Sequence, residues 1–183
     1  PLCLWFLCNL WDYNPLMQIN QPAADFELPD LRGNLHHLSD HRGRIVIVNF
    51  WSCECPHSER ADGLIVEWLK EWDDEVELLS IAANRNESAQ NVEEASRSRN
   101  LPRVLIDAEH IVADLYEAST TPHVFVVDRG GILRYRGAVD DATFRQRKAT
   151  RFFLKEAVDA LLEGHLPALT ETPAYGCTIV REI

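Results

Sequence analysis

The chain has 183 residues, of which 46% are hydrophobic and 26% are charged, so it fits one globular domain with a sizeable core and some additional terminal sequence. Its formal net charge of -11 repels phosphate groups, and its 18 Lys and Arg residues are scattered along the sequence. We therefore expect neither nucleic acid nor an acidic membrane surface as a partner.

The two ends of the chain are expected to lie outside the domain proper. Residues 1–22 form an amino-terminal extension, residues 23–164 the domain and residues 165–183 a tail. The opening residues 1–11 are apolar, but a membrane-spanning helix needs about 20 residues, and no basic start or small-residue cleavage site is present. We expect no integral membrane span and favour packing of the extension on the domain or on a second copy, as in a homodimer.

The predicted elements alternate between strands and helices. In chain order they are a β-hairpin of residues 26–28 and 35–38, strand 45–50, helix 56–72, strand 76–83, helix 88–99, strand 104–106, helix 111–116, strand 124–127, turn 128–131, strand 132–136 and helix 144–162. Strand 45–50 is a continuous β-branched and apolar run, which is typical of a strand buried on both faces. This order predicts an α/β fold: a central mixed β-sheet flanked by helices, with the hairpin as an amino-terminal addition.

Cys55 follows the first core strand directly and precedes the first long helix. In such sheets ligands and chemistry gather at the carboxyl ends of the strands. A thiol at a helix amino terminus lies near unpaired backbone N–H groups, which favour the thiolate, and Pro56 suits the first helical position. We expect Cys55 to be an accessible nucleophile that attacks a disulfide sulfur or a peroxide oxygen. The alternative is an inert buried cysteine.

Several segments together resemble the thioredoxin-like superfamily, and within it the redoxin group of alkyl hydroperoxide reductase and thiol-specific antioxidant type. The segments are the lead-in 24–30, the strand and turn 46–58, Thr120-Thr121-Pro122 and the tail signature Gly176-Cys177-Thr178-Ile179. They are also similar to the thiol reductases of cytochrome maturation and to a bacterial subgroup with a Gly-Cys-x-Ile tail. The resemblance covers residues 23–164 and implies a thioredoxin-like fold, an oxidoreductase acting on thiols, disulfides or peroxides, and a cis-proline at Pro122.

The sequence departs from that pattern at two positions. Family members that exchange disulfides carry a second cysteine three residues after the first, and Ser58 stands there, so Cys55 and Ser58 cannot form a disulfide. Thiol peroxidases of the family carry a hydroxyl where Ser52 lies and a proline where Val48 lies, so half of the peroxidase signature is present. The run from Ser52 to Pro56 is also locally similar to deiodinases, over too few residues to indicate a substrate.

A single nucleophilic thiol needs a second thiol to resolve its mixed disulfide or sulfenic acid. The candidates are Cys53, Cys177, a small thiol such as glutathione, and a partner protein. We place Cys53 ahead of Cys177, although a disulfide between Cys53 and Cys55 closes a tight and strained ring. The five cysteines, which also include Cys3 and Cys8, are too few for a disulfide-stapled scaffold. The cysteine count does not decide the cellular compartment of the protein, for which we slightly favour the cytoplasm.

Four neighbours are expected to assist Cys55. His57 stabilises the thiolate if it is protonated and otherwise lies in solvent. The resemblance implies that Thr121, before Pro122, pairs through its backbone with an extended substrate next to the thiol. Trp51 either shields the thiol from water or belongs to the core. We expect a thiol or disulfide protein, or a small thiol reductant, as partner, and peroxide as a further substrate.

Two other classes of function remain open. Cys53, Cys55, His57 and His123 offer the ligand types of a copper or zinc site, but Cys-x-Cys differs from the spacing of copper-delivery proteins with this fold, so we expect no metal and no other cofactor. A redox-silent binding domain would fit if Cys55 were unreactive. The favoured hypothesis is a thiol redox protein that uses Cys55.

Overall fold

The computed structural model describes residues 17–182 of the chain. Five strands form one central sheet in the order β5-β4-β3-β7-β8. Their bounds are β3 Ile45–Trp51, β4 Val76–Ala82, β5 Val104–Ile106, β7 His123–Val127 and β8 Leu133–Gly137. β3, β4 and β5 are parallel, whereas β7 and β8 join the sheet antiparallel. The predicted mixed α/β sheet is therefore present, with β3 at its centre.

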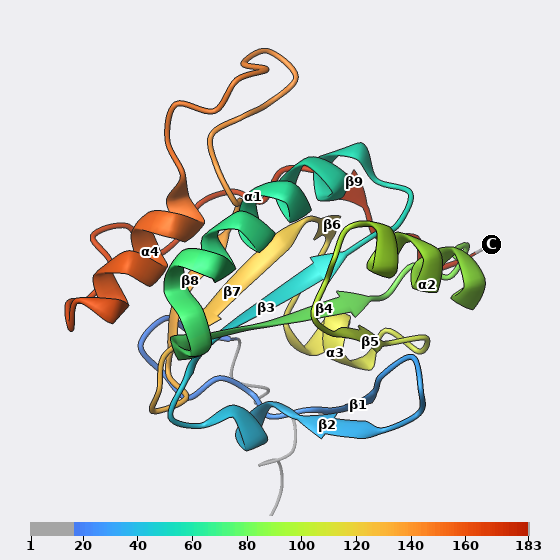
Figure 1. Ribbon diagram of the computed structural model, residues 1–183, viewed down its shortest axis with the longest axis horizontal. Coiled ribbons are helices and arrows are strands. Elements are labelled where there is room, and N and C mark those ends of the chain that lie inside the picture. Colours follow the sequence, from blue (N-terminus) through green and yellow to red (C-terminus); the bar gives the residue numbers. More distant parts are fainter. Residues whose placement is uncertain (1–16, 183) are drawn as a thin grey trace, which may run out of the picture.

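Helices cover both faces of this sheet, and two hydrophobic cores fill the space (Figure 1). α1 (Pro56–Trp72), α2 (Ala89–Ser98) and α4 (Phe153–Leu162) pack on one face. α3 (Ile111–Leu115) and the hairpin of β1 (Glu27–Pro29) and β2 (Leu35–His37) pack on the other. Successive residues of β3 alternate between the two cores, which is why every residue of this strand is buried. The short 3-10 turns Leu38–His41 and Asp73–Glu75 lead into β3 and β4.

Most predicted elements lie within one or two residues of their expected bounds, but the last helix is much shorter than predicted. α4 begins at Phe153, whereas the sequence pattern suggested a start at residue 144. Residues 143–151 form a loop instead, because Phe144 is 79% exposed and the buried stripe of α4 begins only at Leu154. Asp141 holds the loop by accepting hydrogen bonds from the backbone N–H groups of Thr150, at 2.8 Å, and Arg151, at 3.1 Å.

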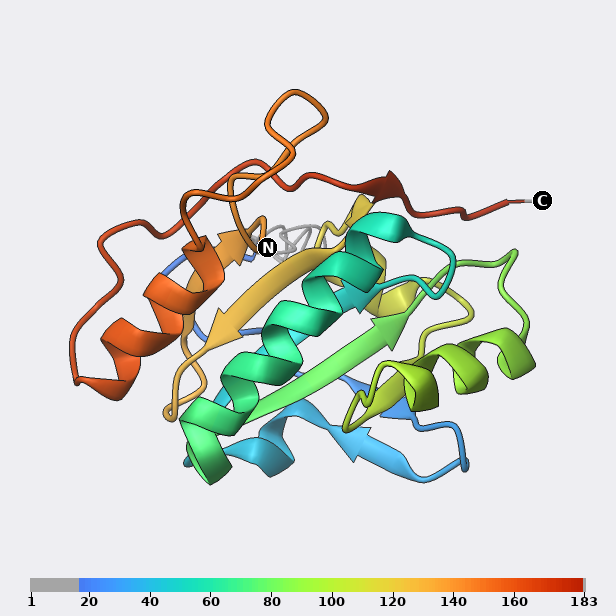
Figure 2. The same ribbon diagram turned by 45° about the horizontal axis from the view of Figure 1, so that its top comes forward.

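The carboxyl-terminal tail returns across the sheet edge at which β3 ends (Figure 2). Its strand β9 (Cys177–Thr178) pairs antiparallel with the short strand β6 (Thr120–Thr121), so that Cys177 lies opposite Thr121. Ile179 is buried in the second core at 3% exposure, and the backbone N–H of Ile179 donates to the Ser119 carbonyl at 3.0 Å. The tail is therefore an integral part of this edge.

The predicted packing of the amino-terminal extension, the homodimer that it suggests, and Cys3 and Cys8 all involve residues outside those that the structure describes. Within residues 17–182 no helix is long and apolar enough to cross a lipid bilayer.

Candidate active site

Cys55 occupies the junction between β3 and α1, as predicted. It is the cap residue before Pro56, which is the first residue of α1. Its backbone N–H donates to the Ser52 hydroxyl at 3.1 Å, and its thiol donates to the Thr121 carbonyl oxygen at 3.1 Å. The Thr121–Pro122 peptide bond is cis, also as predicted, and the Thr121 carbonyl that accepts from the thiol directly precedes it.

The expectation that Cys55 is accessible is wrong for this conformation, because the residue is 2% exposed. The tail covers it: the thiol and the backbone N–H of Cys177 both donate hydrogen bonds to the Cys55 sulfur. Gly176 lies so close to β6 that an added Cβ would be 2.0 Å from the Thr121 carbonyl oxygen. Tyr175 completes the cover, with its ring 5.2 Å from the ring of His57. The sulfur is thus buried against another thiol, in a setting unlike that of an inert core cysteine.

These contacts decide the ionisation of Cys55. Burial alone raises the pKa of a thiol, because it removes the charged form from water. The hydrogen bonds from Cys177 and from the backbone N–H of Ser58 outweigh burial, so the pKa of Cys55 falls below its ordinary value. The first turn of α1 supplies the Ser58 donor, in line with the favourable field expected at a helix amino terminus.

The two candidate resolving thiols are both harder to ionise. Burial and the neighbouring Cys55 raise the pKa of Cys177 to about 12. Burial and the Glu87 carboxylate raise the pKa of Cys53 to about 12. Cys53 packs against the core beneath α1, and Arg99 fixes its carbonyl with a hydrogen bond of 2.6 Å. Cys177 is therefore the thiol that the structure brings into hydrogen-bonding contact with Cys55.

Ser52 supports the turn that carries Cys55. Its hydroxyl accepts from the Cys55 N–H and donates to the Glu87 carboxylate. Glu87 also accepts from the Asn84 amide at 3.2 Å, and Asn84 in turn accepts from the Val180 N–H in the tail at 2.8 Å. One chain of hydrogen bonds thus connects the active-site turn with the far end of the tail.

Trp51 lies in the core beneath this turn, with no exposed surface. Its indole N–H donates to Asp62 at 2.7 Å, and Asp62 also pairs with Arg99 at 3.0 Å. Burial raises the pKa of Asp62 to about 6 despite these two partners. Arg99 is thus held between Asp62 and the carbonyl groups of the turn, where it fixes the turn in place.

The remaining predicted residues do not meet at a metal site within residues 17–182. Ser58 is fully buried, and its hydroxyl has no partner among residues 17–182. His57 is half-buried under Tyr175. Burial lowers the pKa of His123 to about 4. Cys53, Cys55, His57 and His123 are not part of any group of three or more ligand-type side chains that could hold a metal ion in the described part of the chain.

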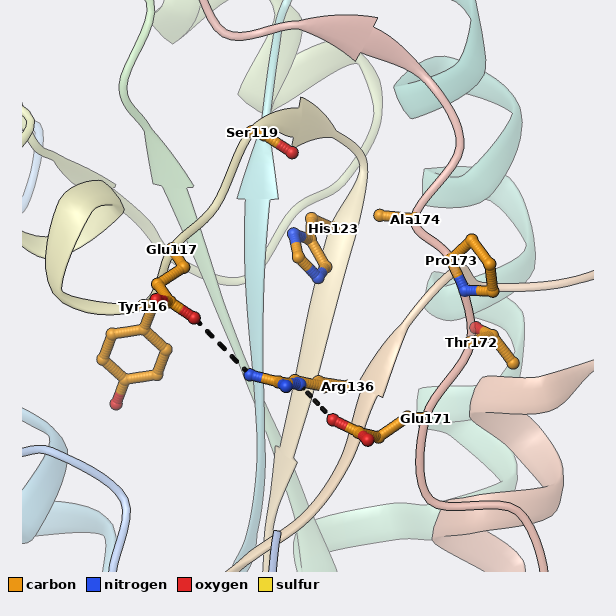
Figure 3. A pocket seen from close by; sticks show the side chains of 9 residues that line it. All are labelled: Tyr116, Glu117, Ser119, His123, Arg136, Glu171, Thr172, Pro173 and Ala174. Atoms are coloured by element: carbon orange, nitrogen blue, oxygen red, sulfur yellow. Dashed lines mark hydrogen bonds and ion pairs between the residues drawn. The ribbon is translucent and has the colours of Figure 1, made fainter. Parts of the chain in front are cut away.

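A cavity of about 430 Å³ lies under the first residues of the tail, beside His123 (Figure 3). Arg136 of β8 extends into it between Glu171 of the tail and Glu117, whose carboxylate is 3.8 Å away. Because both carboxylates face this guanidinium, its charge is already neutralised within the chain. The cavity thus marks where the tail is attached to β8.

The sequence pattern did not single out Glu87, Arg99, Asp62 or Tyr175. Each lies far along the chain from Cys55 or on a helix face that reads as ordinary surface, and only the fold brings them together. The Gly-Cys-x-Ile tail signature was the one available signal, since it marks the segment that carries Tyr175.

Comparison with known proteins places the chain in a family. The model of the AhpC/TSA family matches residues 19–136. The chain belongs to the AhpC/TSA family. Among its relatives, the thiol-disulfide oxidoreductase ResA of Geobacillus kaustophilus is 30% identical over 125 residues, which are 67% of this chain and 71% of the relative. The predicted redoxin type is confirmed, as is an oxidoreductase acting on thiols or disulfides.

Solved structures confirm the predicted thioredoxin-like fold. A hypothetical protein of Sinorhizobium meliloti superposes with a TM-score of 0.80 at 30% identity, covering 88% of this chain and 93% of the other. The thioredoxin domain of a thiol-disulfide oxidoreductase of Bacteroides vulgatus superposes with a TM-score of 0.61 at 16% identity, covering 80% of this chain and 97% of the other. At that identity the second likeness concerns the fold alone.

Proposed function

We propose that this AhpC/TSA protein is a thiol–disulfide oxidoreductase in which Cys55 is the nucleophile and Cys177 is the resolving thiol. The observation that carries the proposal is the pairing of β9 with β6, which places Cys177 opposite Thr121, the residue whose carbonyl oxygen accepts from the Cys55 thiol at 3.1 Å. The family pattern supplies a second cysteine on the helix, and here that position is Ser58. The tail supplies the missing thiol from the opposite side.

The first step uses the lowered pKa of Cys55. Its thiolate attacks one sulfur of a substrate disulfide, the substrate S–S bond breaks, and the other sulfur leaves as a thiolate that takes a proton from water. The products are a mixed disulfide on Cys55 and one reduced substrate thiol. The backbone of Thr121 beside Pro122 is the edge against which an extended substrate would align, in the place where β9 now lies.

The second step uses Cys177. While Cys55 carries its thiolate, that charge helps to hold the pKa of Cys177 high. In the mixed disulfide the charge is gone, so the pKa of Cys177 falls and its thiolate attacks the Cys55 sulfur. The Cys55–Cys177 disulfide forms, and the second substrate thiolate leaves. The substrate has gained two electrons and the protein has lost two, which an external dithiol must restore.

Other assignments have less support. Cys53 as resolving thiol would have to give up its packing against the core. In a thiol peroxidase the Ser52 hydroxyl would serve the peroxide, but here its proton is donated to Glu87. We assign Ser52 to holding the turn, Ser58 to donating its backbone N–H, and His57 to anchoring the tail through Tyr175.

A single-turnover experiment tests the proposal. Reduced protein is mixed with one equivalent of a peptide disulfide without added thiol, and the products are identified by mass spectrometry. The wild type should release both peptide thiols and become oxidised. Cys55→Ser should release no peptide thiol, and Cys177→Ser should stop at the mixed disulfide between Cys55 and the peptide. The control Cys53→Ser should behave as the wild type. Peptide reduction by Cys55→Ser, or complete release by Cys177→Ser, would overturn the assignment.

A further inference from the structure

A basic loop, residues 143–151, stands out from the body of the molecule between β8 and α4 (Figures 1 and 2). It contains Arg145, Arg147, Lys148 and Arg151, on a chain whose formal net charge is -11. Four cations within nine residues therefore form a local positive region on an otherwise acidic protein. This concentration qualifies the expectation that the basic residues are scattered along the sequence.

Most of this positive charge is free to meet a partner. Arg151 pairs with Glu156 at 2.7 Å. The other three cations, Arg145, Arg147 and Lys148, are exposed. They form no ion pair within the part of the chain that the structure describes. Asp141, the nearest acidic residue along the chain, is engaged by the hydroxyl and the backbone N–H of Thr150.

The basic loop also lies next to the thiol site. It lines a cavity of about 300 Å³ together with His57 and Arg60 of the first turns of α1. Phe144 lines the same cavity, and its side chain is 79% exposed. Asp140 neutralises Arg60 through two hydrogen bonds, of 2.6 and 3.0 Å. Among residues 17–182, the loop cation Arg147 is therefore the unpaired charge of this cavity.

The tail shows which part of a bound polypeptide would meet the basic loop. Tyr175, two residues before Cys177, accepts a hydrogen bond from the backbone N–H of Phe144 at 2.6 Å and packs on His57. A substrate strand that replaced β9 on Thr121 would place the residues before its own cysteine in the same position. Those residues would face the cavity and the unpaired cations.

We propose that the basic loop is the docking surface for the substrate of this site, and that the substrate is an extended polypeptide with acidic residues just before its reactive cysteine. The inference rests on the proposed function of Cys55 and adds the chemical class of its partner. The net charge of the chain repels an acidic polypeptide at long range, whereas the basic loop attracts it close to the thiol. The net charge of the chain alone therefore predicts faster reaction with a basic polypeptide, whereas the basic loop predicts faster reaction with an acidic one.

The test uses two synthetic peptides that differ only in the residues before their single cysteine, three Glu or three Lys. Each cysteine is a mixed disulfide with thionitrobenzoate, so attack by Cys55 on the peptide sulfur releases coloured thionitrobenzoate. For the wild type at low ionic strength we expect the Glu peptide to react roughly three- to tenfold faster, with the difference lost at high salt. Arg145→Glu with Arg147→Glu should reverse the preference.

The matched control is Arg32→Glu with Lys70→Glu, which changes the net charge equally at two exposed residues away from the thiol. It should leave the preference for the Glu peptide intact. Faster reaction of the Lys peptide with the wild type, or equal effects of the two double variants, would overturn the docking surface while leaving Cys55 as nucleophile. Failure of both peptides to react would count against the proposed function instead.

Discussion

The Cys55 sulfur is surrounded by donors that belong to two separate segments, the start of α1 and the tail. Ser58 contributes its backbone N–H and Cys177 both its thiol and its backbone N–H. A buried thiol without such donors would stay protonated, because burial penalises the charged form. The reactivity of Cys55 therefore depends on Cys177, the residue that we propose as the resolving thiol.

Replacing the Cys177 thiol separates its role as a donor from its role as a nucleophile. In Cys177→Ala the donor is lost, so the pKa of Cys55 should rise and alkylation of Cys55 should reach its plateau at higher pH than in the wild type. In Cys177→Ser the hydroxyl still donates, so the profile should stay near that of the wild type. The measurement is the alkylation rate of Cys55 against pH, because the rate follows the thiolate fraction. Identical profiles for the two variants would exclude the donor role.

Ser58 marks where this chain departs from the two-cysteine pattern of the family. Its side chain is fully buried beside Cys55, and its hydroxyl has no partner in the described structure. Ser58→Cys should create a local dithiol that forms a disulfide with Cys55 and exchanges faster than the wild type, in a stopped-flow assay with a peptide disulfide. The control Ser58→Ala should exchange at the wild-type rate. Slower exchange by Ser58→Cys would contradict the view that the tail thiol replaces a helix thiol.

At the scale of elements, the tail is the part of the structure that governs access to the thiol. β9 is only two residues long, yet Gly176, Cys177 and Ile179 each contact the β6 region. A substrate has to displace this short strand before it can align on Thr121. Displacement should therefore limit the rate at which Cys55 is modified.

Gly176→Ala tests this dependence with one added methyl group. The new Cβ would collide with the backbone of Thr121, which cannot move aside as a flexible side chain would. Such a clash costs about 1–3 kcal/mol, so the tail should open. Alkylation of Cys55 should then accelerate roughly tenfold when measured at a pH high enough to ionise the thiol fully, where loss of the Cys177 donor no longer affects the rate. Gly63→Ala in α1 is the matched control, because an added Cβ there meets nothing within 4 Å. Unchanged alkylation in Gly176→Ala would show that the tail does not limit access.

Elements with a periodic apolar pattern could be predicted from the sequence, whereas the cover of the site could not. β3, α1 and the position of Cys55 between them follow from local signals. The pairing of β9 with β6 has no such signal, because two-residue strands have no periodicity and their partner lies far along the chain. The same limit affected the start of α4, where Phe144 fits a helical spacing but has no core to face. Contacts made only by folding also explain why the sequence favours Cys53 as the resolving thiol, whereas the geometry supports our proposal of Cys177.

At the scale of the whole molecule, a Cys55–Cys177 disulfide would tie the end of the chain to the centre of the sheet. It would close a loop of about 120 residues, for which restriction of the unfolded chain contributes roughly 3–5 kcal/mol. The oxidised wild type should therefore unfold at higher urea concentration than the reduced protein, as measured by circular dichroism. Cys177→Ser should unfold identically with and without reductant. A wild type that is equally stable in both states would count against this disulfide.

The most direct test is to identify the disulfide that the protein itself forms. The reduced wild type is oxidised with one equivalent of hydrogen peroxide, digested without reduction and mapped by mass spectrometry. We predict that Cys55 is linked to Cys177, with Cys53 recovered as a free thiol. A disulfide between Cys55 and Cys53, or a Cys177 that remains free while Cys55 is oxidised, would contradict the assignment of the tail cysteine.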